Sequence, residues 1–175
     1  MAESAFVILV PEAELCVAPL RTRFDPSVEL GVPAHITVLA PFMAPELISQ
    51  PVLAQIRDAL GQVASFDFQL KTVARFPATA YLAPQPVLPF VALTELIFGR
   101  FPAFPPFRGE HASIVPHLTV ANGNSSEAEV AAHELELALQ VHGPIAANCS
   151  SVVLLENSSG LWKEMHAFPL MRQDG

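Results

Sequence analysis

The sequence predicts an α+β fold made of two similar halves, each containing short strands and helices. The tetrapeptides His35–Val38 (HITV) and His117–Val120 (HLTV) are nearly identical, lie 82 residues apart, and each follows a proline closely. The order of strand-like and helix-like segments is also similar around the two tetrapeptides. No stretch has the composition of a flexible linker, so we expect residues 1–175 to form a single domain of two lobes, each with one His-x-Thr motif.

The first half begins with the apolar run Phe6–Val10, which predicts a buried strand. Ser49 is suited to cap a helix, and Gly61 follows the expected end of that helix. Phe66–Leu70 alternates apolar and polar residues, as a half-buried strand does. In order, we expect a strand over 6–10, a helix over 12–23 that is broken or kinked at Pro19, a loop over 25–33, a strand over 35–39, a helix over 49–60, a strand over 66–70 and a hairpin between 75–77 and 81–84.

The second half follows a similar plan. A capping-box pattern, Ser126–Glu129, predicts the start of a helix. The turn sequence Asn157–Gly160 predicts a hairpin between two strands. In order, we expect a helix over 88–98, a loop rich in proline and phenylalanine over 101–109, a strand over 114–121, the helix opened at 126–129, and strands over 151–156 and 161–168.

The composition favours a folded protein with a small ligand. Of the 175 residues 51% are hydrophobic and 15% are charged, which argues against disorder. The net charge is −8 and Lys and Arg together number nine, so we expect no extended nucleic-acid surface, since nucleic-acid affinity comes largely from basic side chains on phosphates. No apolar run approaches the roughly 20 residues of a membrane span, so we expect no membrane association. We expect a monomer.

The amino-terminal sequence and the cysteines predict a cytoplasmic protein. Met1–Ser4 contains no basic segment, and the apolar run Phe6–Val10 is too short for a signal peptide. The two cysteines, Cys16 and Cys149, lie far apart in the sequence. This pattern is typical of free thiols in a reducing compartment.

The repeated tetrapeptide suggests a catalytic pair. In a strand, residues i and i+2 point to the same face, so each copy presents one imidazole beside one hydroxyl. Two such pairs across a cleft would supply a general acid, a general base and two neutral donors for an anion. A lone histidine on a strand is more often a core residue, but the duplication together with threonine favours a site built from His35, Thr37, His117 and Thr119.

These residues resemble a known pair of motifs. Gly31–Val38, followed by Pro41 and Phe42, resembles the first motif of the 2H phosphoesterase superfamily, and Pro116–Ala121 resembles the second. That superfamily includes bacterial 2′-5′ RNA ligase-like proteins and cyclic nucleotide phosphodiesterases. The resemblance, which extends from Phe6 to about Leu170, implies a bilobal fold with pseudo-twofold symmetry, in which two antiparallel sheets flanked by helices enclose a central cleft.

The resemblance also implies a function. It implies a metal-independent phosphoesterase with no cofactor, which hydrolyses a 2′,3′-cyclic phosphate or a 2′-5′ phosphodiester on a small nucleotide or an RNA end. His35 and His117 would be the acid–base pair, and Thr37 and Thr119 would hold the phosphate oxygens. Two alternatives stay open: a 2′-5′ RNA ligase acting on RNA ends, and a non-catalytic nucleotide-binding module. Which histidine is the acid, and which direction the reaction takes, are also left open.

Other side chains are weaker candidates. Four aromatic residues could stack on a base, although core packing is the commoner role of each: Phe42, Phe76, Tyr81 and Trp162. Four cations could contact a second phosphate: Arg23, Arg75, Arg108 and Lys163. Among these we expect Tyr81, Arg108 and Phe42 to contribute to substrate binding. A zinc site formed by His35, His117 and His111 is a further possibility, which the lack of a short ligand cluster disfavours.

Overall fold

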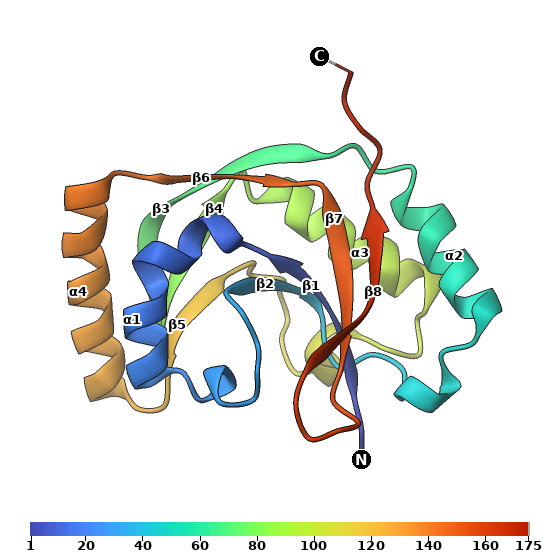
Figure 1. The fold of residues 1–175 in the computed structure, drawn as a ribbon, viewed down its shortest axis with the longest axis horizontal. Coiled ribbons are helices and arrows are strands. Elements are labelled where there is room, and N and C mark those ends of the chain that lie inside the picture. Colours follow the sequence, from blue (N-terminus) through green and yellow to red (C-terminus); the bar gives the residue numbers. More distant parts are fainter. Residues whose placement is uncertain (175) are drawn as a thin grey trace.

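Two four-stranded antiparallel sheets form the framework of the protein (Figure 1). The structure is a computed structural model that describes residues 1–174. The first sheet has the order β2-β1-β7-β8, and the second has the order β5-β4-β3-β6. The strands are β1 (Ser4–Leu9), β2 (His35–Leu39), β3 (Phe66–Phe76), β4 (Thr79–Gln85), β5 (Leu118–Asn122), β6 (Ile145–Cys149), β7 (Ser151–Glu156) and β8 (Lys163–Pro169). The predicted α+β class, with two antiparallel sheets and flanking helices, is confirmed.

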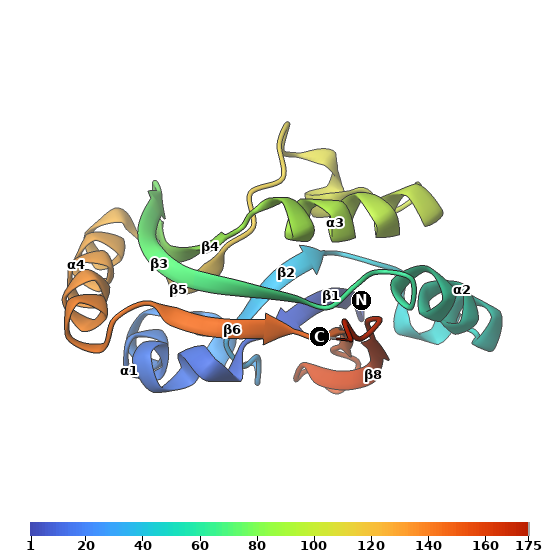
Figure 2. The same ribbon diagram turned by 90° about the horizontal axis from the view of Figure 1, so that it is seen from above.

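Four α-helices and several short 3₁₀ turns connect the strands over the described residues. The helices are α1 (Glu14–Phe24), α2 (Gln50–Leu60), α3 (Leu88–Arg100) and α4 (Ser125–His142). The turns are η1 (Pro11–Ala13), η2 (Pro26–Val28), η3 (Pro45–Leu47) and η4 (Pro106–Gly109). Figure 2 shows α1 beside α4 at one end of the molecule and α2 at the other, with α3 along one side.

The two halves are related as the repeated motif predicts. β1, α1, β2 and α2 of the first half correspond in order and sheet position to β4, α3, β5 and α4 of the second. The first helix of each half packs on the motif strand of the other half, because α1 lies against β5 and α3 lies against β2. α1 also packs on α4, and α3 packs on α2. One hydrophobic core therefore includes side chains from both sheets and from all four helices.

Several element boundaries differ from the predictions, and the differences at α4, β5 and β3 have a clear description. α4 begins at Ser125 with Asn124 as its N-cap, whose side chain accepts a 2.9 Å hydrogen bond from the Glu127 amide, so the predicted start two residues later is wrong. β5 begins only at Leu118, because Pro116 has no amide hydrogen to donate to a sheet. β3 runs from residue 66 to residue 76 and is longer than expected.

One strand was not predicted. β6 pairs with β3 at the edge of the second sheet. In β6, Ala147 and Cys149 face the core, and Ala146 and Asn148 are exposed. Alanine and asparagine in this short segment weaken the apolar alternation that marks a strand. Among the described residues, no helix combines the length and the apolarity needed to cross a membrane.

Candidate active site

Each motif places a histidine beside a threonine on one face of the chain. In both motifs the histidine and the threonine are half-buried, whereas the aliphatic residue between them, Ile36 or Leu118, is fully buried. The motif strands β2 and β5 are each at the edge of their sheet, and these two edges lie next to each other (Figure 1). The two His-x-Thr pairs therefore come from adjacent strands of different sheets.

The two imidazoles are held in the same way. His35 Nδ1 lies 2.8 Å from the carbonyl oxygen of Pro33, and His117 Nδ1 lies 2.6 Å from that of Val115. A carbonyl oxygen only accepts hydrogen bonds, so Nδ1 carries the hydrogen in both rings. Nε2 is left as the nitrogen that can accept or release a proton, which is the arrangement a general acid–base pair needs.

Burial changes the proton affinity of both rings. Desolvation lowers the pKa of His35 and of His117 below the usual value, although each backbone hydrogen bond partly opposes this effect. A charge on His117 further lowers the pKa of His35. The second proton therefore binds to the pair at a lower pH than the first, which favours a singly protonated pair with one neutral and one charged imidazole.

Strand pairing extends the correspondence to the neighbouring residues. Thr37 is opposite Val7 of β1, and Thr119 is opposite Tyr81 of β4. In both sheets the register shifts immediately before that partner residue. Val7 and Tyr81 therefore occupy equivalent positions, and the two half-sites differ in the side chain beside the threonine: a small aliphatic group in one and an aromatic ring in the other.

Several contacts fix the backbone around the first motif. Glu14 of α1 accepts a 2.7 Å hydrogen bond from the amide of Ala34, the residue before His35. Thr94 of α3 donates a 2.7 Å hydrogen bond to the carbonyl oxygen of Val38, the last residue of the motif. The edge of β2 that no strand covers is thus held by side chains from two helices, which restricts the movement of the motif.

A buried ion pair organises the loop before the first motif. Arg21 Nε lies 2.9 Å from Asp25 Oδ2, and both side chains are almost fully buried. Arg21 also donates 2.9 and 3.0 Å hydrogen bonds to the carbonyl oxygen of Val32 and to the Ser27 hydroxyl. This cluster holds a carbonyl three residues before His35, so Arg21 acts on the site by positioning the loop.

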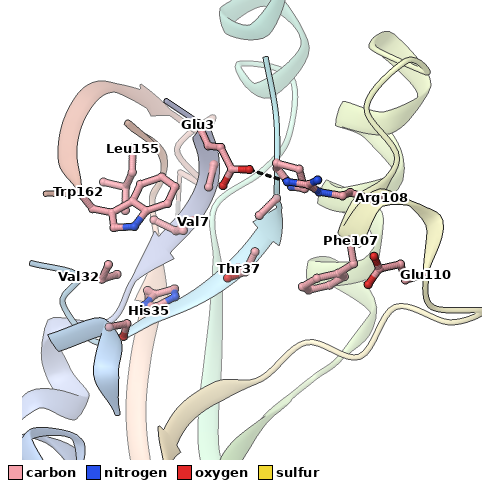
Figure 3. Close-up of a pocket in the computed structure, with 14 residues that line it drawn as sticks. Glu3, Val7, Val32, His35, Thr37, Phe107, Arg108, Glu110, Leu155 and Trp162 are labelled. Atoms are coloured by element: carbon pink, nitrogen blue, oxygen red, sulfur yellow. Dashed lines mark hydrogen bonds and ion pairs between the residues drawn. The ribbon is translucent and has the colours of Figure 1, made fainter. Parts of the chain in front are cut away.

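A pocket of about 360 Å³ opens beside the first motif (Figure 3). His35 and Thr37 line it, and Figure 3 shows Trp162 and Val7 on one side of them and Phe107 and Arg108 on the other. Arg108 follows Phe107 in a turn in which both residues have positive φ angles, 49° for Phe107 and 55° for Arg108. This backbone conformation is rare for residues other than glycine. The amide of Phe107 donates a 2.7 Å hydrogen bond to the carbonyl oxygen of Ala40, which holds this turn at the end of β2.

The second motif has an aromatic surrounding. The ring of His117 meets Tyr81 and Phe76 edge to face, with centroid distances of 5.3 and 5.4 Å. Burial raises the pKa of Tyr81. His117 and Thr119 are not among the described residues that line the pocket beside His35, so the pocket covers the first half-site only.

The three residues predicted to bind substrate lie in different surroundings. Tyr81 lies beside His117, as a residue of the second half-site would. Arg108 lines the pocket, and its guanidinium pairs with Glu3 at 2.6 Å. The expected role of Phe42 has to be corrected, because its side chain is 5% exposed and packs in the core against three other phenylalanines: Phe6, Phe101 and Phe104. A ring enclosed in this way has no free face for a base.

Of the other weak candidates, some lie at the pocket and others lie away from it. Arg23 and Arg75 pair with glutamates of α4, outside the pocket. Trp162 lines the pocket.

The sequence analysis missed two acidic residues, Glu3 and Glu110, which also line the pocket. Glu110 could have been found from its place two residues after Arg108, whereas only the fold brings Glu3 to the pocket.

His111 does not join a ligand set. Its ring packs edge to face on Phe107 at 5.3 Å, and its charge lowers the pKa of His117 after the larger effect of burial. Within residues 1–174, no three His, Cys, Asp or Glu side chains are grouped so that they could hold a metal ion. The three histidines considered as zinc ligands, His35, His117 and His111, therefore do not form a metal-binding group.

Comparison with known proteins identifies the family. Residues 9–161 match the model of the 2′-5′ RNA ligase superfamily. A protein of Halalkalibacterium halodurans named as a candidate phosphoesterase is 28% identical over 156 residues, which cover 88% of each chain. A Bacillus cytotoxicus protein with the same kind of name is 34% identical over 102 residues, which cover 58% of each chain.

Solved structures share the fold. E. coli LigT, determined in complex with 3′-AMP, superposes with a TM-score of 0.64 at 15% identity and covers 96% of this chain and 97% of its own. A Thermus thermophilus protein, TT0787, superposes with a TM-score of 0.61 at 15% identity, covering 98% and 99%. The matched residues include both His-x-Thr motifs, so the predicted relationship to 2H phosphoesterases is confirmed and the chain belongs to the 2′-5′ RNA ligase superfamily.

Proposed function

We propose that this protein is a metal-independent phosphoesterase that hydrolyses a 2′,3′-cyclic phosphate or a 2′-5′ phosphodiester of a small nucleotide. The observation that supports this most directly is that both imidazoles make the same hydrogen bond. In each ring Nδ1 is bound to the carbonyl oxygen two residues earlier, which leaves Nε2 available for proton transfer. The relatives named as candidate phosphoesterases agree with the reaction type. LigT was determined with 3′-AMP, a small nucleotide with an open 3′ phosphate monoester, which is one of the two monoesters that opening a 2′,3′-cyclic phosphate can give.

The proposed reaction uses both half-sites. The neutral imidazole takes a proton from water as the water oxygen bonds to phosphorus, and the P–O bond to the ribose oxygen breaks. The charged imidazole gives its proton to that leaving oxygen, so the product is a phosphate monoester with one free hydroxyl. The hydroxyls of Thr37 and Thr119 donate hydrogen bonds to the phosphoryl oxygens, whose charge increases in the transition state.

Activity should survive the removal of metal ions, because side chains supply the acid, the base and the anion donors. We expect 2′,3′-cyclic nucleotides or 2′-5′ dinucleotides to be hydrolysed at the same rate before and after dialysis against EDTA. Turnover lost with EDTA and restored by zinc or manganese would contradict the proposal. Joining of RNA ends bearing cyclic phosphates, in the same assay, would favour the ligase.

The pH dependence should show the effect of burial on the two histidines. Burial lowers both pKa values, so each imidazolium loses its proton at a lower pH than an exposed histidine does. The alkaline limb of kcat/KM should therefore lie below about pH 6.5. In the kcat profile this limb should move to higher pH, because a bound phosphate anion stabilises the imidazolium. An alkaline limb of kcat/KM well above pH 7 would contradict this prediction.

A further inference from the structure

The pocket beside His35 and Thr37 combines an apolar wall with a charged rim. The wall is formed by side chains of β1, β7, the loop before β2 and the β7–β8 connection: Ala5, Val7, Val32, Leu155 and Trp162. The charged rim consists of Glu3, Arg108 and Glu110. In Figure 3 Arg108 and Glu110 lie across Thr37 from Trp162, and Glu3 lies between Trp162 and Arg108 with its carboxylate toward the guanidinium. A molecule that reaches from the phosphate site into the pocket therefore meets both the apolar wall and the charged rim.

The rim disfavours anions although it contains an arginine. Glu3 and Glu110 contribute two negative charges, and Arg108 is the one Lys or Arg among the described residues that line the pocket. The guanidinium of Arg108 is 2.6 Å from the Glu3 carboxylate, which neutralises it. Glu110 is exposed in the turn after Phe107 and adds an uncompensated negative charge to the rim. A second phosphate in the pocket would therefore be repelled.

We propose that this pocket selects substrates whose only anionic group is the scissile phosphate, with an uncharged nucleoside against the apolar wall. This inference rests on the proposed function, because it takes a phosphate held between the two motifs as the fixed point of binding. Glu3 and Glu110 act as specificity-determining residues that reject nucleotides with a further phosphate on the 5′ side. Selectivity then arises from an unfavourable contact with the wrong ligand.

The test compares two ligands that differ in one phosphate. Adenosine 3′-phosphate and adenosine 3′,5′-bisphosphate are titrated into the protein by calorimetry at low salt, and the ratio of the two Kd values is the readout. We expect the monophosphate to bind on the order of tenfold more tightly, as one unscreened like-charge contact near a protein surface allows. Raising the salt to about 0.5 M should reduce the ratio, because ions screen exposed charges.

Variants of the rim should change this ratio in opposite directions. Glu110→Gln should reduce the preference for the monophosphate severalfold, and Glu3→Gln should reduce it further because it also frees the Arg108 guanidinium. Arg108→Gln should increase the preference, since it leaves two carboxylates without a cation. The matched control is Glu95→Gln, an exposed glutamate on α3 that does not line the pocket, and it should leave the ratio unchanged.

The outcomes separate the inference from the proposed function. A bisphosphate that binds as tightly as the monophosphate, a failure of both to bind, or rim variants that all shift the ratio the same way would overturn the inference. Because the readout is binding, it does not depend on turnover. Selective binding without hydrolysis of any cyclic phosphate or 2′-5′ linkage would support the selective pocket and contradict the phosphoesterase.

Discussion

Replacing either motif histidine with alanine should reduce kcat by about 10²–10⁴, the usual contribution of one general acid or base. His35→Ala removes one proton carrier and His117→Ala removes the other, while the backbone hydrogen bonds of both strands remain. The double variant should lose little more than the worse single variant, because the two imidazoles act as a unit. Steady-state kinetics on the best cyclic phosphate or 2′-5′ dinucleotide tests this.

The threonine variants and the thermal stability of the histidine variants serve as controls for this prediction. Thr37→Val and Thr119→Val should reduce kcat less than the histidine variants do, because each removes one neutral donor from the anion. Both histidines are half-buried, so their truncation should leave thermal unfolding nearly unchanged. Folded histidine variants with wild-type turnover would require the paired-histidine mechanism to be abandoned.

Replacing Arg21 with methionine should destabilise the protein by about 3–5 kcal/mol, because the Asp25 carboxylate would stay buried without its partner. Arg21 and Asp25 are 3% and 4% exposed and are joined at 2.9 Å. The carbonyl oxygen of Val32 would also lose a buried donor. In thermal denaturation we expect the Tm to fall by roughly 6–20 °C, from about 2–4 °C per kcal/mol in a chain of this size.

A second substitution tests the cause of this loss. Arg21→Met combined with Asp25→Asn removes the unpaired charge and retains an acceptor for the Ser27 amide, which Asp25 Oδ1 now binds at 3.0 Å. The double variant should therefore be more stable than Arg21→Met alone. If Arg21→Met unfolded within 1–2 °C of wild type, the pair would have no structural importance for the loop before His35.

The sequence predicted those parts of the molecule that depend on short-range patterns. The His-x-Thr repeat, the strand alternation and the prolines are local, and they led to both motifs and to the class of fold. Arg108 was also within reach, because it lies in the loop that leads to the second motif. The burial of Phe42 was out of reach, since it depends on rings 36 and more residues away in the chain.

The rim of the pocket illustrates the same limit. Glu3 meets Arg108 only because the start of β1 and the η4 turn are brought to the same end of β2, and 105 residues separate the two side chains in the sequence. The missed strand β6 has a different cause: its alanines and asparagine give a weak hydrophobic signal, and its position is set by pairing with β3. Tertiary contacts, rather than local preference, decide both features.

The crossed packing of the two halves has a mechanical consequence. α1 lies on β5 and α3 lies on β2, so a helix of each half packs against the motif strand of the other half, on both sides of the contact between β2 and β5. Spreading the two imidazoles apart would require both helices to slide off apolar surfaces at the same time. We therefore expect the two halves to move as one body, so that the distance between the two motif histidines changes little when a ligand binds.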